Sequence, residues 1–223
     1  MYKHFIKPVA DFFVSLIGAI ILLPFFAIIA IAIKIDSKGP VFFKQKRVGK
    51  CKNGEIKYFN ILKFRTMRTD TPHDAPTHLL SDANSYITKV GAFLRKTSLD
   101  ELPQIFNILK GDMSVIGPRP ALWNQDDLVA EREKYGANDV KPGLTGWAQI
   151  NGRDELEIPV KAKLDGEYVE KQSFLFDCKC FFGTIVSVLK SDGVVEGGTG
   201  EIEKKKKQES EKQINEEKTE ETV

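Results

Sequence analysis

Two adjacent carboxylates, Asp100 and Glu101, are the side chains in this sequence best suited to chemistry. Apolar residues follow them at helical spacing, at positions 102, 105, 106 and 109, which predicts an amphipathic helix. Ser98 and Glu101 have the spacing of a capping box, which places both carboxylates at the positive end of that helix. An ionised Asp in this place can act as a nucleophile, and a neighbouring carboxylate can hold a divalent cation. The alternative is that both acids only cap the helix.

Pro103 and Gly111 set the limits of the same helix. Proline lacks an N–H and is tolerated only in a first turn, so either Asp100 lies near the N-cap or the first turn is irregular. Gly111 follows the last apolar position, as glycines commonly do at helix ends. We therefore expect the acidic pair in the first turn of a short helix that ends near Lys110.

Two arginines stand in stretches that suit the binding of an anion. Arg119 lies in the turn 117–120, where two prolines hold the backbone rigid around a guanidinium that can bind phosphate bidentately. Arg153 ends a glycine-rich stretch, 141–153, whose backbone N–H groups can approach an anion closely. This stretch matches neither a P-loop nor a dinucleotide-binding motif. Each stretch, taken by itself, is also typical of a plain surface loop.

The N-terminal run from Phe12 to Ile33 is apolar or small apart from the hydroxyl of Ser15, and it is long enough to cross a bilayer as a helix. Pro24 lies in its middle, where it removes a helix hydrogen bond and favours a kink. Basic residues flank the run on both sides: Lys3, Lys7, Lys34, Lys38, Lys44, Lys46 and Arg47. Because Lys and Arg prefer the cytoplasmic side, we expect a re-entrant helix that bends at the proline and leaves on the face it entered. A single span with its N-terminus outside is the alternative.

The remaining pattern predicts an α+β fold that is mainly helical. Turn residues at 37–40 and 53–54, beside partly alternating apolar runs, predict a short β-hairpin with Lys63 and Arg65 on one face of its second strand. Helices are expected over residues 86–96, 122–135, 160–171 and 174–190. The last of these is too short and too charged at its start to span a bilayer, so we expect it either at the membrane interface or packed on the first helix. The chain then divides into a membrane helix, a cytoplasmic domain with interfacial amphipathic helices, and a disordered Lys/Glu-rich tail, at residues 1–36, 37–192 and 193–223.

Composition narrows the class of protein. The 223 residues carry 33 Lys and Arg and 31 Asp and Glu, a net charge of +2, which gives no indication of nucleic-acid binding. The odd number of cysteines, 3, indicates a reducing compartment rather than a disulfide framework. Hydrophobic residues make up 42% of the chain, which is enough for an ordinary packed core.

A series of short motifs occurs in the order seen in the bacterial sugar transferases. The motifs are KFRTM at 63–67, SLDELPQ at 98–104, LKGDMS at 109–114, GPRP at 117–120 and KPGLTGWAQINGR at 141–153. Over about residues 2–189 the sequence resembles the small monotopic members of this family, the polyprenyl-phosphate phosphoglycosyl transferases, which begin the assembly of glycoconjugates. Leu23 stands before the membrane-helix proline, where many members carry Ser.

The resemblance implies a covalent mechanism and a set of site residues. Asp100 would attack a phosphorus of a UDP-sugar, UMP would leave, and a polyprenyl phosphate such as undecaprenyl phosphate would take the phosphosugar from Asp100. Mg²⁺, with Asp100 and Glu101 as ligands, would offset the charge of the diphosphate. Arg119 and Arg153 would hold phosphate oxygens. Further candidates for that role are Lys63, Arg65 and Arg95, and Asp177 is implied to lie near the site.

The resemblance also implies where the protein works. Its catalytic domain would face the cytoplasm from the inner membrane, where nucleotide sugars are found, and it would carry out the first membrane step of glycan assembly. Its partners would be the lipid bilayer, a UDP-sugar, a polyprenyl phosphate and downstream glycosyltransferases. Two other classes of function fit the sequence: a membrane-anchored scaffold without chemistry, and a membrane-tethered nucleotide-binding protein that transfers nothing. The acidic pair together with Arg119 and Arg153 favours the enzyme.

Overall fold

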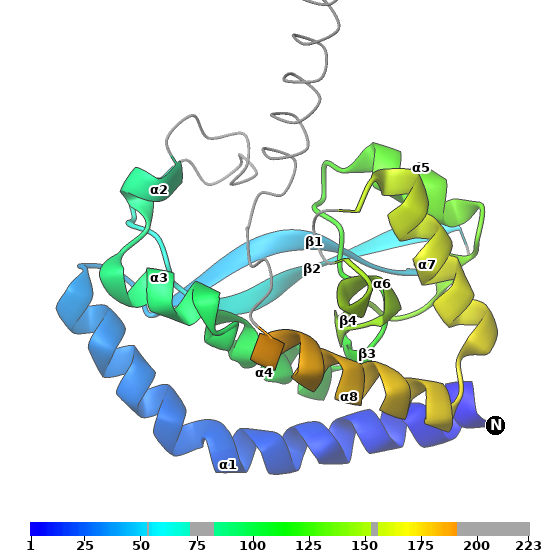
Figure 1. Ribbon diagram of the computed structural model, residues 1–223, viewed down its shortest axis with the longest axis horizontal. Helices are drawn as coiled ribbons and strands as arrows, with labels where there is room; N and C mark the ends of the chain where they lie inside the picture. Colours follow the sequence, from blue (N-terminus) through cyan, green and yellow to red (C-terminus); the bar gives the residue numbers. More distant parts are fainter. Residues whose placement is uncertain (53, 72–82, 153–155, 191–223) are drawn as a thin grey trace, which may run out of the picture.

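The N-terminal helix is the longest element of the molecule. The computed structural model describes residues 1–52, 54–71, 83–152 and 156–190. Its chain begins with the π-helical turn η1 (Tyr2–Ile6), which continues into α1 (Lys7–Asp36). Figure 1 shows α1 running beneath the rest of the molecule and turning upward in its C-terminal half, toward α3. The long apolar helix predicted from the sequence is therefore confirmed, and by length and composition it could cross a membrane.

One side of α1 forms part of the protein core, and the rest of its surface is apolar and exposed. Ala19, Phe26 and Ile33 are buried along one stripe of the helix and belong to the same hydrophobic cluster as Phe64 and Leu94. Large apolar side chains elsewhere on α1 are exposed, among them Ile17, Ile20, Leu23, Phe25, Ile28 and Ile31. An exposed apolar surface of this kind is unusual for a soluble protein and indicates association with a membrane.

A long antiparallel hairpin confirms the predicted β-hairpin. Strand β1 (Phe42–Lys52) pairs with β2 (Glu55–Phe64), with Phe42 opposite Phe64 at one end and Lys52 opposite Glu55 at the other. Both strands are longer on the turn side than the sequence pattern indicated, and an irregularity in register follows Val48. Phe59 and Ile61 of β2 pack on Ile108 and Met113, which places this face of the hairpin on the core.

A second, parallel sheet consists of β3 (Ser114–Ile116) and β4 (Gly143–Thr145). The Gly117 N–H donates to the Thr145 carbonyl at 2.8 Å, and the Gly143 N–H donates to the Pro118 carbonyl at 2.9 Å. A Cβ atom added to Gly143 would lie 2.1 Å from the Gly117 nitrogen, so the two backbones approach this closely only because glycine stands there. The sheet joins two stretches that the sequence analysis could only treat as separate turns.

Short helices complete an α+β fold that is mainly helical, as predicted. They are α2 (Ala83–Tyr86), α3 (Lys89–Lys96), the 3₁₀ helix η3 (Leu99–Gln104), α4 (Ile105–Lys110), α5 (Asp126–Glu133), η4 (Ala137–Asp139), α6 (Trp147–Ile150), α7 (Ile158–Lys171) and α8 (Phe174–Lys190). The expected helices at 160–171 and 174–190 match α7 and α8 closely. Helix α3 starts later than expected because Thr88 caps it, its hydroxyl accepting from the Gly91 N–H. The predicted tail at 193–223 lies outside the described residues.

Candidate active site

Glu101 is the centre of a cluster of charges drawn from three distant segments. Its Oε1 accepts from Lys63 Nζ on β2 at 2.7 Å and from Arg119 Nη2 at 2.8 Å, while Oε2 accepts from Arg119 Nη1 at 3.2 Å. Burial alone would raise the pKa of Glu101, but the charges of Arg119 and Lys63 outweigh burial and hold it well below its usual range. Glu101 is therefore a fixed carboxylate with two cations against it.

The acidic pair lies on an irregular turn that follows α3. Ser98 adopts a left-handed conformation with φ 56°, and the chain then enters η3, which contains Pro103. Of the two possibilities that Pro103 left open for the start of this helix, the irregular first turn is thus confirmed. The capping box predicted from Ser98 and Glu101 is wrong: Ser98 makes no side-chain cap hydrogen bond, its N–H donates to the Arg95 carbonyl, and the Glu101 carboxylate binds Lys63 and Arg119.

Asp100 is buried beside this cluster, with 3% of its surface exposed. Its neighbour in sequence is the ion-paired Glu101, so the turn presents one carboxylate to two cations and keeps the other shielded from bulk water. A shielded carboxylate beside an ion-paired residue can act as a nucleophile toward a phosphate ester.

Gln104 belongs to the same turn and was not singled out by the sequence analysis. It is 1% exposed, and its Nε2 finds no hydrogen-bond partner within the described part of the chain. Gln104 follows Glu101 by three residues, a spacing that aligns side chains on one edge of a 3₁₀ helix. Because buried amide groups are nearly always paired, an unused donor at this edge suits a ligand oxygen.

The turn that carries Arg119 is fixed to the glycine-rich stretch by the parallel sheet. Strand β3 runs directly into residues 117–120, and β4 lies within the stretch 141–153, so the sheet brings together the two segments that were predicted to bind anions. Arg119 thereby reaches Glu101 across the molecule. Arg153, the second predicted phosphate-binding arginine, lies outside the described residues.

Arg65 and Arg95 each bind a segment close to an end of the hairpin. Arg65 is buried and donates from Nη1 to the Lys38 carbonyl at 2.9 Å and from Nη2 to the Ser37 carbonyl at 2.7 Å, which ties the end of α1 to the hairpin. Arg95 Nε donates to Thr66 Oγ1 at 2.9 Å. Strand β2 ends at Phe64, between Lys63 and Arg65, and the two side chains that were expected on one strand face bind different partners.

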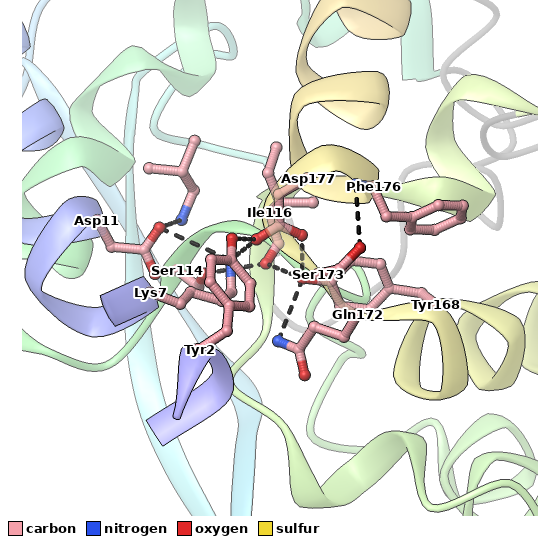
Figure 2. A network of polar contacts seen from close by, with 11 residues as sticks. Tyr2, Lys7, Asp11, Ser114, Ile116, Tyr168, Gln172, Ser173, Phe176 and Asp177 are labelled. Atoms are coloured by element: carbon pink, nitrogen blue, oxygen red, sulfur yellow. Dashed lines mark hydrogen bonds and ion pairs between the residues drawn. The ribbon is translucent and has the colours of Figure 1, made fainter. Parts of the chain in front are cut away.

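Asp177 lies on α8 within a network that joins both ends of the described chain (Figure 2). Its carboxylate accepts from Tyr2 Oη at 2.5 Å and from Lys7 Nζ at 2.8 Å, and it lies 2.8 Å from Tyr168 Oη. Burial and the neighbouring Asp177 raise the pKa of Tyr168, which keeps this hydroxyl protonated. No pattern in the sequence indicated that Tyr2 or Tyr168 would contact Asp177.

The residues that could hold a metal ion are the acidic pair. No group of three or more His, Cys, Asp or Glu side chains is gathered as a metal site among the described residues. Mg²⁺, however, usually takes only one or two protein carboxylates and completes its shell with water and substrate phosphates. Asp100 and Glu101 fit that requirement in donor type, although a metal ion on Glu101 must compete with Lys63 and Arg119.

Comparison with known proteins identifies the family. Residues 2–191 match the family described as Bacterial sugar transferase. The chain belongs to the bacterial sugar transferase family. This membership confirms the family indicated by the motifs and, with it, the expectation of a sugar-transferring enzyme.

Relatives with assigned names include proteins of similar and of greater length. This bacterial sugar transferase is 44% identical over 169 residues to the sugar transferase EpsL of Bacillus subtilis, covering 76% of the chain and 79% of EpsL. It is 39% identical over 189 residues to the undecaprenyl-phosphate glucose phosphotransferase of Komagataeibacter xylinus, covering 80% of the chain and 35% of that relative. Identity is 38% over 196 residues to the UDP-glucose:undecaprenyl-phosphate glucose-1-phosphate transferase of Escherichia coli strain K12, covering 82% and 40%. The chain thus spans less than half the length of the last two relatives.

Proposed function

We propose that this protein transfers a phosphosugar from a UDP-sugar to a membrane polyprenyl phosphate, most simply undecaprenyl phosphate, and releases UMP. The names of the relatives from Komagataeibacter xylinus and Escherichia coli support a transferase of this type. The observation that carries the proposal is the Glu101 cluster, in which Lys63 and Arg119 bind the carboxylate of the residue that follows the buried Asp100. Such an arrangement suits a diphosphate substrate, whose charge needs cations close to the reacting phosphorus.

The proposed reaction has two displacement steps at one phosphorus atom. A carboxylate oxygen of Asp100 attacks the phosphorus that bears the sugar, and the bond from that phosphorus to the bridging oxygen breaks, so that UMP leaves with the bridging oxygen. The phosphosugar remains as an acyl phosphate on Asp100. A phosphate oxygen of the polyprenyl phosphate then attacks the same phosphorus, and the Asp100 carboxylate is released with the formation of a polyprenyl-diphosphate sugar.

Positive groups of the chain have distinct tasks in this scheme. Arg119 offers a planar fork that can bind phosphate oxygens bidentately, and Lys63, which shares the Glu101 Oε1 atom with Arg119, offers a point charge. Arg153 and Arg95 are further phosphate ligands in this proposal, whereas both Nη groups of Arg65 are bound to backbone carbonyls at the end of α1. When bound by Asp100 and Glu101, Mg²⁺ would neutralise charge on the diphosphate and on the leaving UMP.

The membrane arrangement in this proposal brings the lipid substrate to the same site. Helix α1 bends at Pro24 and returns to the cytoplasmic face of the inner membrane, while the exposed apolar side of α8, which includes Phe174, Leu175 and Phe182, lies in the interface. The phosphate of the polyprenyl chain then sits at the level of the acidic pair, on the side where UDP-sugars are made. The product enters exopolysaccharide or another glycan through glycosyltransferases that act next.

Release of UMP tests the proposal directly. Purified protein in a nanodisc, with Mg²⁺, undecaprenyl phosphate and a panel of UDP-sugars, should release UMP with at least one of them. Without the lipid, the peptide that contains Asp100 should gain the mass of one phosphosugar, and Asp100→Asn should gain none. If a UDP-sugar binds but neither UMP nor the adduct forms, the protein is a nucleotide-binding protein and the proposal is wrong.

A further inference from the structure

Asp11 is an unusual residue for its place in the chain. It is the only acidic residue between Lys7 and Lys34, in a helix otherwise made of apolar and small residues with one serine and two prolines. A carboxylate in such a helix is costly to keep within or near a bilayer unless it is fully partnered, so its partners indicate what it does.

Both oxygens of the Asp11 carboxylate bind the first two residues of β3 (Figure 2). Ser114 Oγ donates to Oδ2 at 2.6 Å, and the Val115 N–H donates to Oδ1 at 3.2 Å. Lys7 Nζ, one helical turn earlier, lies 3.7 Å from Oδ1 and offsets the charge. The carboxylate of a membrane-type helix therefore serves as the anchor for the start of a strand in the cytoplasmic domain.

The far end of the same strand is held by the Asp177 network. Tyr168 Oη lies 3.0 Å from the Ile116 carbonyl and 2.8 Å from Asp177 Oδ1, and Asp177 also accepts from Lys7. Lys7 thus forms ion pairs with Asp11, which binds the start of β3, and with Asp177, which lies near its end. The three-residue strand is clamped between α1 on one side and α7 and α8 on the other.

Strand β3 continues without a gap into the turn of Arg119. Only Gly117 and Pro118 separate Ile116 from Arg119, and Gly117 is fixed by its hydrogen bond to Thr145. A shift of the strand along its axis would therefore move the Arg119 guanidinium relative to Glu101, to which it makes hydrogen bonds of 2.8 and 3.2 Å.

We propose that Asp11 is a positioning residue for the reaction: it docks the N-terminal half of α1 onto β3 and thereby sets the place of Arg119 at the phosphate site. The proposal rests on the proposed function in so far as Arg119 binds the diphosphate. According to this proposal, the contact between Asp11 and β3 affects both the docking of α1 and the affinity for the nucleotide. A helix that only anchored the protein would have no such effect on nucleotide affinity.

The test is a mutant cycle on the affinity for UDP, which requires no transfer of sugar. Asp11→Asn should weaken UDP binding about tenfold in the full chain held in nanodiscs, since coupled contacts of this kind are worth roughly 1.4 kcal/mol. In an Arg119→Ala background the same change should have almost no effect, because its influence passes through Arg119. Equal losses in both backgrounds would overturn the proposal.

Ser114→Ala removes the hydrogen bond to Asp11 from the side of the strand, and it provides a second test if Asp11→Asn does not fold. It should weaken UDP binding in the same direction and again only when Arg119 is present. Ser15→Ala is the matched control on α1, because the buried Ser15 hydroxyl makes no hydrogen bond to any described residue. It should leave UDP affinity unchanged in both backgrounds, and a loss as large as that of Asp11→Asn would also overturn the proposal.

Hydrogen exchange separates this proposal from the proposed function. The Val115 amide of wild-type protein should exchange slowly, and Asp11→Asn should speed its exchange while Ser15→Ala does not. If exchange and UDP binding respond as expected but wild-type protein releases no UMP, the positioning role stands and the transfer reaction fails. Unchanged exchange at Val115 in Asp11→Asn would refute the docking contact, whatever the transfer assay shows.

Discussion

Glu101 and Arg119 face each other in a paired arrangement, with Oε1 2.8 Å from Nη2 and Oε2 3.2 Å from Nη1. The bidentate pair links the turn of the acidic residues to the turn that follows β3, two segments with no local reason to meet. It fixes the distance between the carboxylate pair and the guanidinium before any substrate arrives. Preorganised charge of this kind lowers the cost of stabilising a phosphoryl-transfer transition state.

Removing either carboxylate of the acidic pair should abolish turnover for different reasons. Asp100→Asn should lose activity completely because an amide cannot form the acyl phosphate, whereas a residue that only caps a helix would tolerate Asn. Glu101→Gln should lose activity through metal binding and through release of Lys63 and Arg119, and it should still form a trace of adduct. UMP release and intact-mass spectrometry measure both effects. Near-normal turnover of Asp100→Asn would rule out the covalent mechanism.

The depressed pKa of Glu101 makes part of the stability depend on pH. Because the folded-state pKa lies below the ordinary value of 4.5, the unfolded chain takes up a proton first as the pH falls. The stabilising contribution is therefore complete above about pH 4.5 and decreases as the pH falls toward the folded-state pKa. Urea unfolding of Glu101→Gln between pH 7 and pH 3 should show a shallower loss of stability than that of wild type. Parallel curves for the two proteins would contradict this account.

Gln104 should be needed for turnover but not for folding. Gln104→Leu keeps a similar volume and removes a donor that has no partner among the described residues, so stability should be unchanged or slightly higher. Turnover should fall about tenfold or more, as expected when a hydrogen bond of about 1.5 kcal/mol to a charged ligand is lost. Gln172→Leu is the control, since Gln172 makes only a 3.4 Å contact with Tyr168 Oη. A Gln104→Leu variant that is unstable and fully active would reverse the assignment.

Gly143→Ala should damage the sheet that holds the Arg119 turn. The new Cβ would lie 2.1 Å from the Gly117 nitrogen, and backbone cannot move aside as a side chain can. We expect a loss of about 3 kcal/mol or more in unfolding free energy, at the upper end of what overpacking costs. Gly18→Ala is the comparison, because its Cβ meets only the Ile105 Cδ1 methyl at 2.9 Å and should cost little. Similar melting temperatures for the two variants would argue against the close backbone contact.

The topology of α1 can be read from two introduced cysteines. Lys3→Cys and Lys38→Cys should both resist a membrane-impermeant thiol reagent in intact cells and react after permeabilisation, because basic residues flank the helix on both sides. A background with Cys178→Ser removes the partly exposed native thiol. Labelling of the N-terminal site alone in intact cells would show a span, and the re-entrant arrangement would be wrong.

Local patterns predicted the elements that are long and periodic, and they failed where distant groups decide the structure. The hairpin, α7 and α8 follow from alternation, turn residues and helical spacing. The capping box was wrong because a capping hydrogen bond could not compete for Glu101 with two cations brought from β2 and from the Arg119 turn. The β3–β4 pairing could not be predicted, because strands of three residues have no period and the contact depends on glycines that are far apart in sequence.

Candidate site residues could be singled out from the sequence where a short motif contains its own chemistry. Asp100, Glu101 and Arg119 lie in short motifs, and Glu101 and Arg119 bind each other as part of one cluster with Lys63. Asp11 could not be singled out from the sequence, because a single acidic residue is also common where an apolar membrane helix begins. Its partners on β3 lie about a hundred residues further along the chain, and only the fold shows that they meet.

Because α1 is part of the protein core, binding of its exposed side to a bilayer would stabilise the folded state. Ala19, Phe26 and Ile33 fill a core that also contains Phe64 and Leu94, so the helix cannot leave the catalytic domain without opening that core. Lipid that covers the exposed apolar side of α1 would bind the native chain, so insertion into lipid and folding of the domain would be linked equilibria. The apparent melting temperature should then rise with lipid content, and a chain trimmed of α1 would expose its own interior rather than become a soluble enzyme.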